Sequence, residues 1–95
     1  MKGAIASIEL FASRAGEDTR RLTLTVGTPE REGDAGWVCR VALADLHRPE
    51  SIVAPDSVSA LAAALAQGRA WVDALEADGC VLTRDRAGTR PFAWP

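Results

Sequence analysis

An alanine-rich block over residues 56–79 constrains the fold more than any other part of the chain. Asp56 can cap the first free amides of a helix, and its charge suits the positive end of the helix dipole. Gly79 is well placed to end the helix. At about 100° per residue, one stripe of the block is apolar. Its members are Leu61, Leu65, Gly68, Val72 and Leu75, with Ala60, Ala64 and Trp71 on one flank and Val58 on the other. The block therefore predicts one long amphipathic helix that covers a sheet.

Gly68 lies inside this apolar stripe. A glycine in a helix interior costs roughly 1 kcal/mol relative to alanine. We expect a close approach between the helix backbone and the sheet to offset that cost.

The opposite side of the helix is rich in small residues, namely Ala63, Ala66, Ala70 and Ala74. Small side chains permit another helix to approach closely, so this side is a candidate interface with a second copy or another protein. Alanine is also the best helix former, which accounts for the same residues without any partner. Both interpretations stay open at this point.

The hydrophobic period changes from 3.6 to 2 in the residues before the helix, which indicates β-strands. Residues 21–26 alternate most cleanly, with Leu22, Leu24 and Val26 on one face. Strands are predicted over residues 4–13, 21–26 and 37–46, with a short fourth strand at residues 52–53. Residues 14–18, 27–36 and 48–50 are interpreted as turns or loops, and residues 80–83 as a possible short strand after the helix. Short connections favour an antiparallel meander.

The last six residues place two aromatic side chains, Phe92 and Trp94, between prolines. One interpretation is that both pack back against the sheet or the edge of the helix, because a chain this short needs apolar area for its core. The alternative is that they dock on another subunit. Phe92 and Trp94 are therefore candidate interface residues, together with the alanines of the helix.

Composition limits the classes of function. A chain of 95 residues fits one domain, spanning residues 1–95, with 47% apolar and 25% charged residues. A net charge of −2 argues against binding nucleic acid through bulk electrostatics. The sequence lacks an apolar run that could span a membrane and a signal-peptide core, so we expect a cytoplasmic protein without a membrane partner. In that compartment the two cysteines are expected as thiols, although a disulfide stays possible.

No pattern of residues predicts catalysis, a metal site or a cofactor. His47 is the one histidine of the chain, and a Cys39–His47 nucleophile pair is disfavoured because Cys39 alternates with core residues. One histidine and two cysteines do not have a recognisable zinc spacing. Arg84, Arg86 and Arg90 lie near the tail aromatics, but neighbouring carboxylates weaken their field. We therefore expect a protein that is not an enzyme and does not bind nucleic acid.

The middle of the chain resembles a family of small uncharacterised bacterial proteins. The resemblance covers residues 37–75 and rests on the W-x-C strand that begins at Trp37, the turn after it, and the D-S-x-x-A-L helix that begins at Asp56. Ala54 and Pro55 stand where the family commonly has a glycine before the capping aspartate. The family has no established activity, so the resemblance implies only the order of strand and helix.

These observations predict an α+β domain: an antiparallel meander of three to four strands with one long C-terminal helix packed on one face. The leading hypothesis for function is a non-enzymatic protein-binding module that self-associates, as a homodimer, or binds another protein. Two alternatives stay open. One is a small-molecule binder or enzyme with a pocket between sheet and helix near Trp37 and Trp71. The other is a structural accessory domain of a larger complex.

Overall fold

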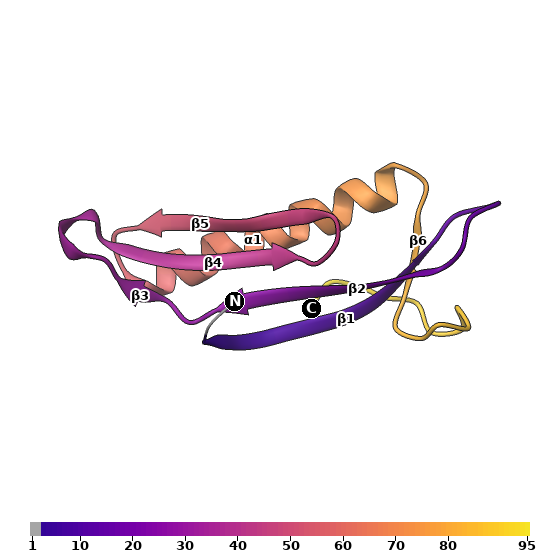
Figure 1. Ribbon diagram of the computed structural model, residues 1–95, viewed down its shortest axis with the longest axis horizontal. Coiled ribbons are helices and arrows are strands. Elements are labelled where there is room, and N and C mark those ends of the chain that lie inside the picture. Colours follow the sequence, from indigo (N-terminus) through magenta and orange to yellow (C-terminus); the bar gives the residue numbers. More distant parts are fainter. Residues whose placement is uncertain (1–2) are drawn as a thin grey trace.

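The computed structural model describes residues 3–95 and has an elongated shape of 49 × 23 × 22 Å, in which one helix lies across an antiparallel sheet (Figure 1). The elements are β1 (Ala4–Ser13), β2 (Arg20–Gly27), β3 (Glu30–Arg31), the 3-10 turn η1 (Gly33–Ala35), β4 (Trp37–Leu43), β5 (His47–Ala54), α1 (Ser57–Ala77) and β6 (Val81–Thr83). The predicted α+β class, the meander, the long helix and the short strand after it are confirmed.

The four longer strands are neighbours in chain order, β1 beside β2, β2 beside β4 and β4 beside β5, all antiparallel. The two-residue strand β3 pairs with the first residues of β4, within the segment expected to be a loop. On the other border of the sheet, β6 pairs only with the last three residues of β1, from Phe11 to Ser13.

The predicted boundaries of the third and fourth strands are wrong. β4 ends at Leu43, because Asp45 adopts a left-handed conformation (φ 71°) and turns the chain. Residues 48–50, interpreted as a turn, belong to the eight-residue strand β5. Their polar and proline content suggested a loop, but β5 is a border strand, where charged side chains and proline are tolerated.

Helix α1 begins where the sequence predicted. The Asp56 side chain accepts a hydrogen bond from the Ser59 backbone N–H at 2.6 Å, which lowers the pKa of this carboxyl. At the other end, Gly79 follows the helix with φ 96°. The buried stripe is rotated from the predicted one, so that Leu65 is 39% exposed and Trp71 is buried. The buried residues of the helix are Ala60, Ala64, Gly68, Trp71 and Val72.

Gly68 makes the predicted close approach to the sheet. A Cβ atom at this position would lie 3.0 Å from Leu24 Cδ2 and 3.3 Å from Trp94 Cη2. The C-terminal tail therefore lies beside α1 on the same face of the sheet. Phe92 is buried at 7% exposure and Trp94 packs against the core, as expected if the tail folds back.

The core lies between α1, the tail and one face of the sheet. It is built from alternate residues of the strands, including Leu10, Leu22, Leu24, Val26, Cys39, Val41, Leu43 and Leu82. The other face of the sheet is largely polar, as expected for one half-buried sheet. Two large apolar residues there, Phe11 and Val38, are each 8% exposed. Phe11 is covered by the guanidinium of Arg86, which lies 5.1 Å from the ring centroid.

Among residues 3–95, none of the helical segments combines the length and apolar character needed to cross a membrane.

Candidate functional site

A cavity of about 630 Å³ lies where the β1–β2 turn meets the C-terminal end of α1. Its apolar lining comes from the sheet, the helix and Leu46, and most of its charged lining comes from the β1–β2 turn. The lining comprises Ala12, Ser13, Arg14, Gly16, Glu17, Asp18, Arg20, Leu22, Leu46, Leu75, Asp78 and Cys80. The sequence analysis missed this cavity, because it forms only when residues about 60 positions apart fold together.

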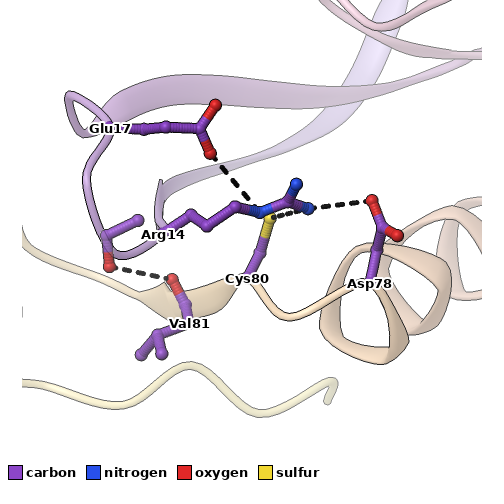
Figure 2. Close-up of polar contacts among 6 residues, drawn as sticks. Arg14, Glu17, Asp78, Cys80 and Val81 are labelled. Carbon is purple, nitrogen blue, oxygen red and sulfur yellow. Dashed lines mark hydrogen bonds and ion pairs between the residues drawn. The ribbon is translucent and has the colours of Figure 1, made fainter.

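Arg14 ties the two sides of the cavity together (Figure 2). Its Nη2 donates to Asp78 Oδ2 at 2.8 Å and to Cys80 Sγ at 3.4 Å, and its Nε lies 3.5 Å from Glu17 Oε2. The hydrogen bond to Asp78 is the main cause that raises the pKa of Arg14 above its usual range. Asp78 caps the end of α1, so the guanidinium also lies near the negative end of the helix dipole.

This arrangement is suited to holding the β1–β2 turn against the helix. The Arg14 and Asp78 side chains are 39% and 76% exposed, and exposed ion pairs stabilise a fold by about 0–1 kcal/mol. Within residues 3–95, no group of three or more histidine, cysteine, aspartate or glutamate side chains could hold a metal ion. The charged and apolar side chains that line the cavity are suited to a small polar molecule.

The structure separates Cys39 from His47. Cys39 is buried in β4, where its Sγ donates to the Gly27 carbonyl at 3.3 Å and burial raises the pKa of the thiol. His47 stacks on Trp71, with ring centroids 4.6 Å apart. In the β4–β5 register, Cys39 lies opposite Ile52 and not opposite His47. The two residues therefore do not form a nucleophile–base pair, and both cysteines are free thiols.

The small-molecule alternative anticipated a pocket near Trp37 and Trp71. A shallow cavity of about 470 Å³ lies at Trp71 and His47, and Trp37 does not line it. Trp37 lies opposite Ala54, beside the start of α1. Trp71 is fourteen residues into the helix and stacks on His47 at the other end of β5. At a rise of about 1.5 Å per residue, Trp71 lies about 21 Å along the helix axis from Ser57, whereas Trp37 lies beside the start of the helix. They therefore cannot line one compact pocket.

The second candidate site is the border of the sheet formed by β1 (Figure 1). In the described part of the chain, β6 covers this border only at residues 11–13, so residues 4–10 have β2 on one side and no strand on the other. We call residues 4–10 the open edge. Ala4, Ile5, Ala6, Ser7 and Glu9 are exposed along it, and Ile8 is half-buried.

Backbone groups on the open edge have a direction fixed by the ladder. The Thr23 carbonyl accepts a hydrogen bond from the Ala44 N–H at 3.0 Å, so Thr23 directs its backbone groups towards β4. Glu9 lies directly opposite Thr23. In an antiparallel pair, two opposite residues that do not hydrogen-bond each other both direct their backbone N–H and C=O groups away from the partner strand. This direction alternates from one residue to the next along a strand. The N–H and C=O groups of Ser7 and Glu9 therefore face away from β2, towards solvent.

Large apolar side chains are also exposed on α1 and at the start of β1. α1 packs mainly on β4 and β5, which leaves the first half of β1 less covered. On the helix, Val58 is 75% and Leu65 is 39% exposed, and Ile5 of β1 is 51% exposed. Leu65 is about 60° from Gly68 and about 120° from Trp71 around the helix. It therefore lies on the side that faces β2 and β1.

The candidate interface residues predicted from the sequence differ in their exposure to solvent. Ala66, Ala70 and Ala74 are exposed on the outer side of α1, and Ala63 is half-buried. Phe92 is buried in the core of its own chain, whereas Trp94 is half-buried. The sequence feature that corresponds to the open edge is the single charge among residues 4–10. The inward face of this strand could not be predicted, because apolar residues occur at both odd and even positions.

Comparison of the chain with protein families, with curated proteins and with solved structures finds no match. The resemblance of residues 37–75 to small bacterial proteins therefore stays a prediction.

Proposed function

We propose that this protein is a non-enzymatic protein-binding module that binds its partner through the open edge of β1. The observation that carries the proposal is the unprotected character of this edge. A row of unpaired backbone groups is a template for another strand, and stable monomers protect such edges with charges, proline or covering segments. Along the open edge, Glu9 is the one charged residue, and proline is absent from residues 4–10.

The opposite border of the sheet shows how this chain protects an edge. β5 carries Arg48, Pro49 and Glu50 in succession, all exposed. Proline lacks an N–H donor, and charged side chains oppose the approach of another strand. The two borders of one sheet therefore differ in protection, which favours a partner at β1 and not at β5.

The extent of exposed surface also supports a partner. The chain exposes 5984 Å², whereas a folded monomer of 10.1 kDa exposes roughly 5,300 Å². Its radius of gyration is 14.5 Å, compared with about 12–13 Å for a compact domain of this length. The chain thus leaves roughly 700 Å² more surface in water than an average monomer of its mass, which favours a partner.

The test uses matched proline variants at the two borders. The Ser7 N–H faces solvent, so Ser7→Pro removes a donor that the monomer does not use. By the same alternation along β4 and β5, Ser51→Pro removes an outward N–H at the opposite border. We expect the tagged protein to capture a stoichiometric partner, seen by light scattering and mass spectrometry, and Ser7→Pro to lose it while Ser51→Pro keeps it. Equal capture by both variants would contradict binding through the open edge.

A second candidate function, small-molecule binding, is favoured by the cavity of about 630 Å³ beside Arg14. Arg20 lines this cavity and provides a matched variant that leaves the ion pairs of Arg14 intact. A ligand that raises the melting temperature of the wild type but not of Arg20→Ala would support this alternative. A cytoplasmic location belongs to the proposal as well, and it is supported by the two free thiols.

A further inference from the structure

We propose that the partner at the open edge is a second copy of this chain, whose β1 pairs antiparallel with the first around a two-fold axis between the two Ser7 residues. This inference rests on the proposed function and names its partner and register. The two sheets join into one continuous sheet, with both helices on the same face.

The hydrogen-bonding groups of the open edge are self-complementary. Ser7 and Glu9 direct N–H and C=O groups outward, as the Glu9–Thr23 pairing and the Ala44–Thr23 hydrogen bond require. With Ser7 opposite Ser7 of the second copy, each serine donates one backbone hydrogen bond and accepts one. An interface that uses the same patch on both subunits is the one that a two-fold dimer needs.

The position of β6 selects this register. The outward groups of Phe11 already face Thr83 of β6. An axis through Ile8 would place Ile5 of the second copy opposite Phe11, where Thr83 lies. An axis through Ser7 places Ile5 opposite Glu9 and leaves Phe11 to β6. The register shift between Ala4 and Ala6 then bends each strand away at the end of the pairing.

Charge favours the same register. With the axis at Ile8, the two Glu9 side chains would be diagonal neighbours on one face, about 7–8 Å apart. With the axis at Ser7, four residues separate each Glu9 from the Glu9 of the second copy along the paired strands, which is roughly 14 Å. Repulsion between the two carboxylates is therefore weaker at the Ser7 axis.

The apolar side chains beside the edge become covered in this dimer. Ala6 and Ile8 lie on the core face of β1, opposite Val26 and Leu24. At the Ser7 axis, Ile8 of one copy lies beside Ala6 of the other, which continues the core across the new strand pair. In the single chain Ala6 is exposed and Ile8 is half-buried. Surface that a monomer leaves in water is thus buried in the dimer.

Disulfide cross-linking of Ser7→Cys tests the register directly. In the proposed dimer the two residues at position 7 form a hydrogen-bonded pair with Cα atoms about 5.5 Å apart, which lies within the range that a disulfide spans. The variant is made in a Cys80→Ser background, and Cys39 is fully buried. Ser51→Cys in the same background is the control at the opposite border. We expect a covalent dimer from Ser7→Cys and none from Ser51→Cys.

Three results would overturn the inference in distinguishable ways. Preferential cross-linking of Ile8→Cys would overturn the Ser7 register. A dimer by light scattering that neither cross-links at position 7 nor weakens about tenfold or more in Ser7→Pro would overturn pairing through β1. A monomeric protein that still captures a different protein through the open edge would overturn the second copy as partner and leave the proposed function standing.

A monomer that captures no partner in an edge-dependent manner would overturn the inference and the proposed function together. Circular dichroism of the Ser7→Pro and Ser7→Cys variants provides the check on folding. Since Ser7→Cys keeps the backbone N–H, it tests the dimer even if the proline variant fails to fold.

Discussion

Replacing Gly68 by alanine separates two opposing effects that the structure places at one residue. Alanine is better than glycine in a helix interior by about 1 kcal/mol, so propensity alone predicts a more stable protein. The added Cβ would lie 3.0 and 3.2 Å from the two methyl carbons of Leu24 and 3.3 Å from Trp94. These distances are shorter than ordinary carbon–carbon contacts of 3.5–4.0 Å.

We expect the close contacts to outweigh propensity, because Leu24 is surrounded by other core side chains and has little room to move aside. Leu24 is 1% exposed in the middle of the core. Inserting a methyl group into a packed core costs about 1–3 kcal/mol. After the gain of about 1 kcal/mol in helix propensity, the expected net loss of stability for Gly68→Ala is about 1 kcal/mol. For a domain of this size that loss lowers the melting temperature by about 4–8 °C.

Urea unfolding followed by tryptophan fluorescence measures the change in the free energy of unfolding. Two further variants separate the contributions of helix propensity and packing. Ala66→Gly, on the exposed side of the helix, reports propensity without a packing change and is expected to cost about 1 kcal/mol. In a Leu24→Ala background the clashing methyl groups are absent, so Gly68→Ala is expected to become stabilising. A stabilised Gly68→Ala single variant, or no change of sign in the Leu24→Ala background, would refute the close-approach argument.

Three further predictions concern the tail, the thiols and the response to acid. Phe92→Ala is expected to lower the free energy of unfolding by about 3 kcal/mol, because the ring is buried at 7% exposure, and an unchanged urea midpoint would mean that the tail is not part of the core. In the native protein, a thiol reagent is expected to modify Cys80 and not Cys39, whose burial raises the pKa of its thiol; equal rates by mass spectrometry would contradict this. Asp85 accepts hydrogen bonds from Thr89 and Arg90, which lower its pKa from 3.8 to about 2. Its contribution to stability is therefore complete above the unfolded value and is lost as the pH falls through the folded value. The difference in urea midpoint between wild type and Asp85→Asn should shrink from pH 5 to pH 2, and a constant difference would show that Asp85 is not held in this way.

The helix was predictable because its signals are local. The Asp56 cap, the apolar period and Gly79 all lie within the segment that they define. The rotation of the buried stripe was not predictable, because Leu65 and Trp71 are both apolar. Which one faces the core depends on where the sheet lies. Trp71 is covered because the first residue of β5, His47, stacks on it.

β5 shows the limit of pattern reasoning in the sheet. Its residues 48–50 carry two charges and a proline, so the sequence alone indicated a turn. The segment is a strand because β4 offers it hydrogen-bonding partners on one side and solvent surrounds its charges on the other. A border strand obtains its conformation from its neighbour, and that neighbour is not visible in the strand's own sequence.

The succession of strands and helix along the chain and the two ends of the helix could be predicted from the sequence, since these depend on residues close together in the chain. The open edge of β1, by contrast, becomes visible only in the folded chain. β6 reaches β1 across about 70 residues of chain and covers Phe11 to Ser13, but it is too short to cover Ser7 and Glu9. An edge is exposed when no other segment of the chain pairs with it. Pairing between distant segments is fixed only when the whole chain packs.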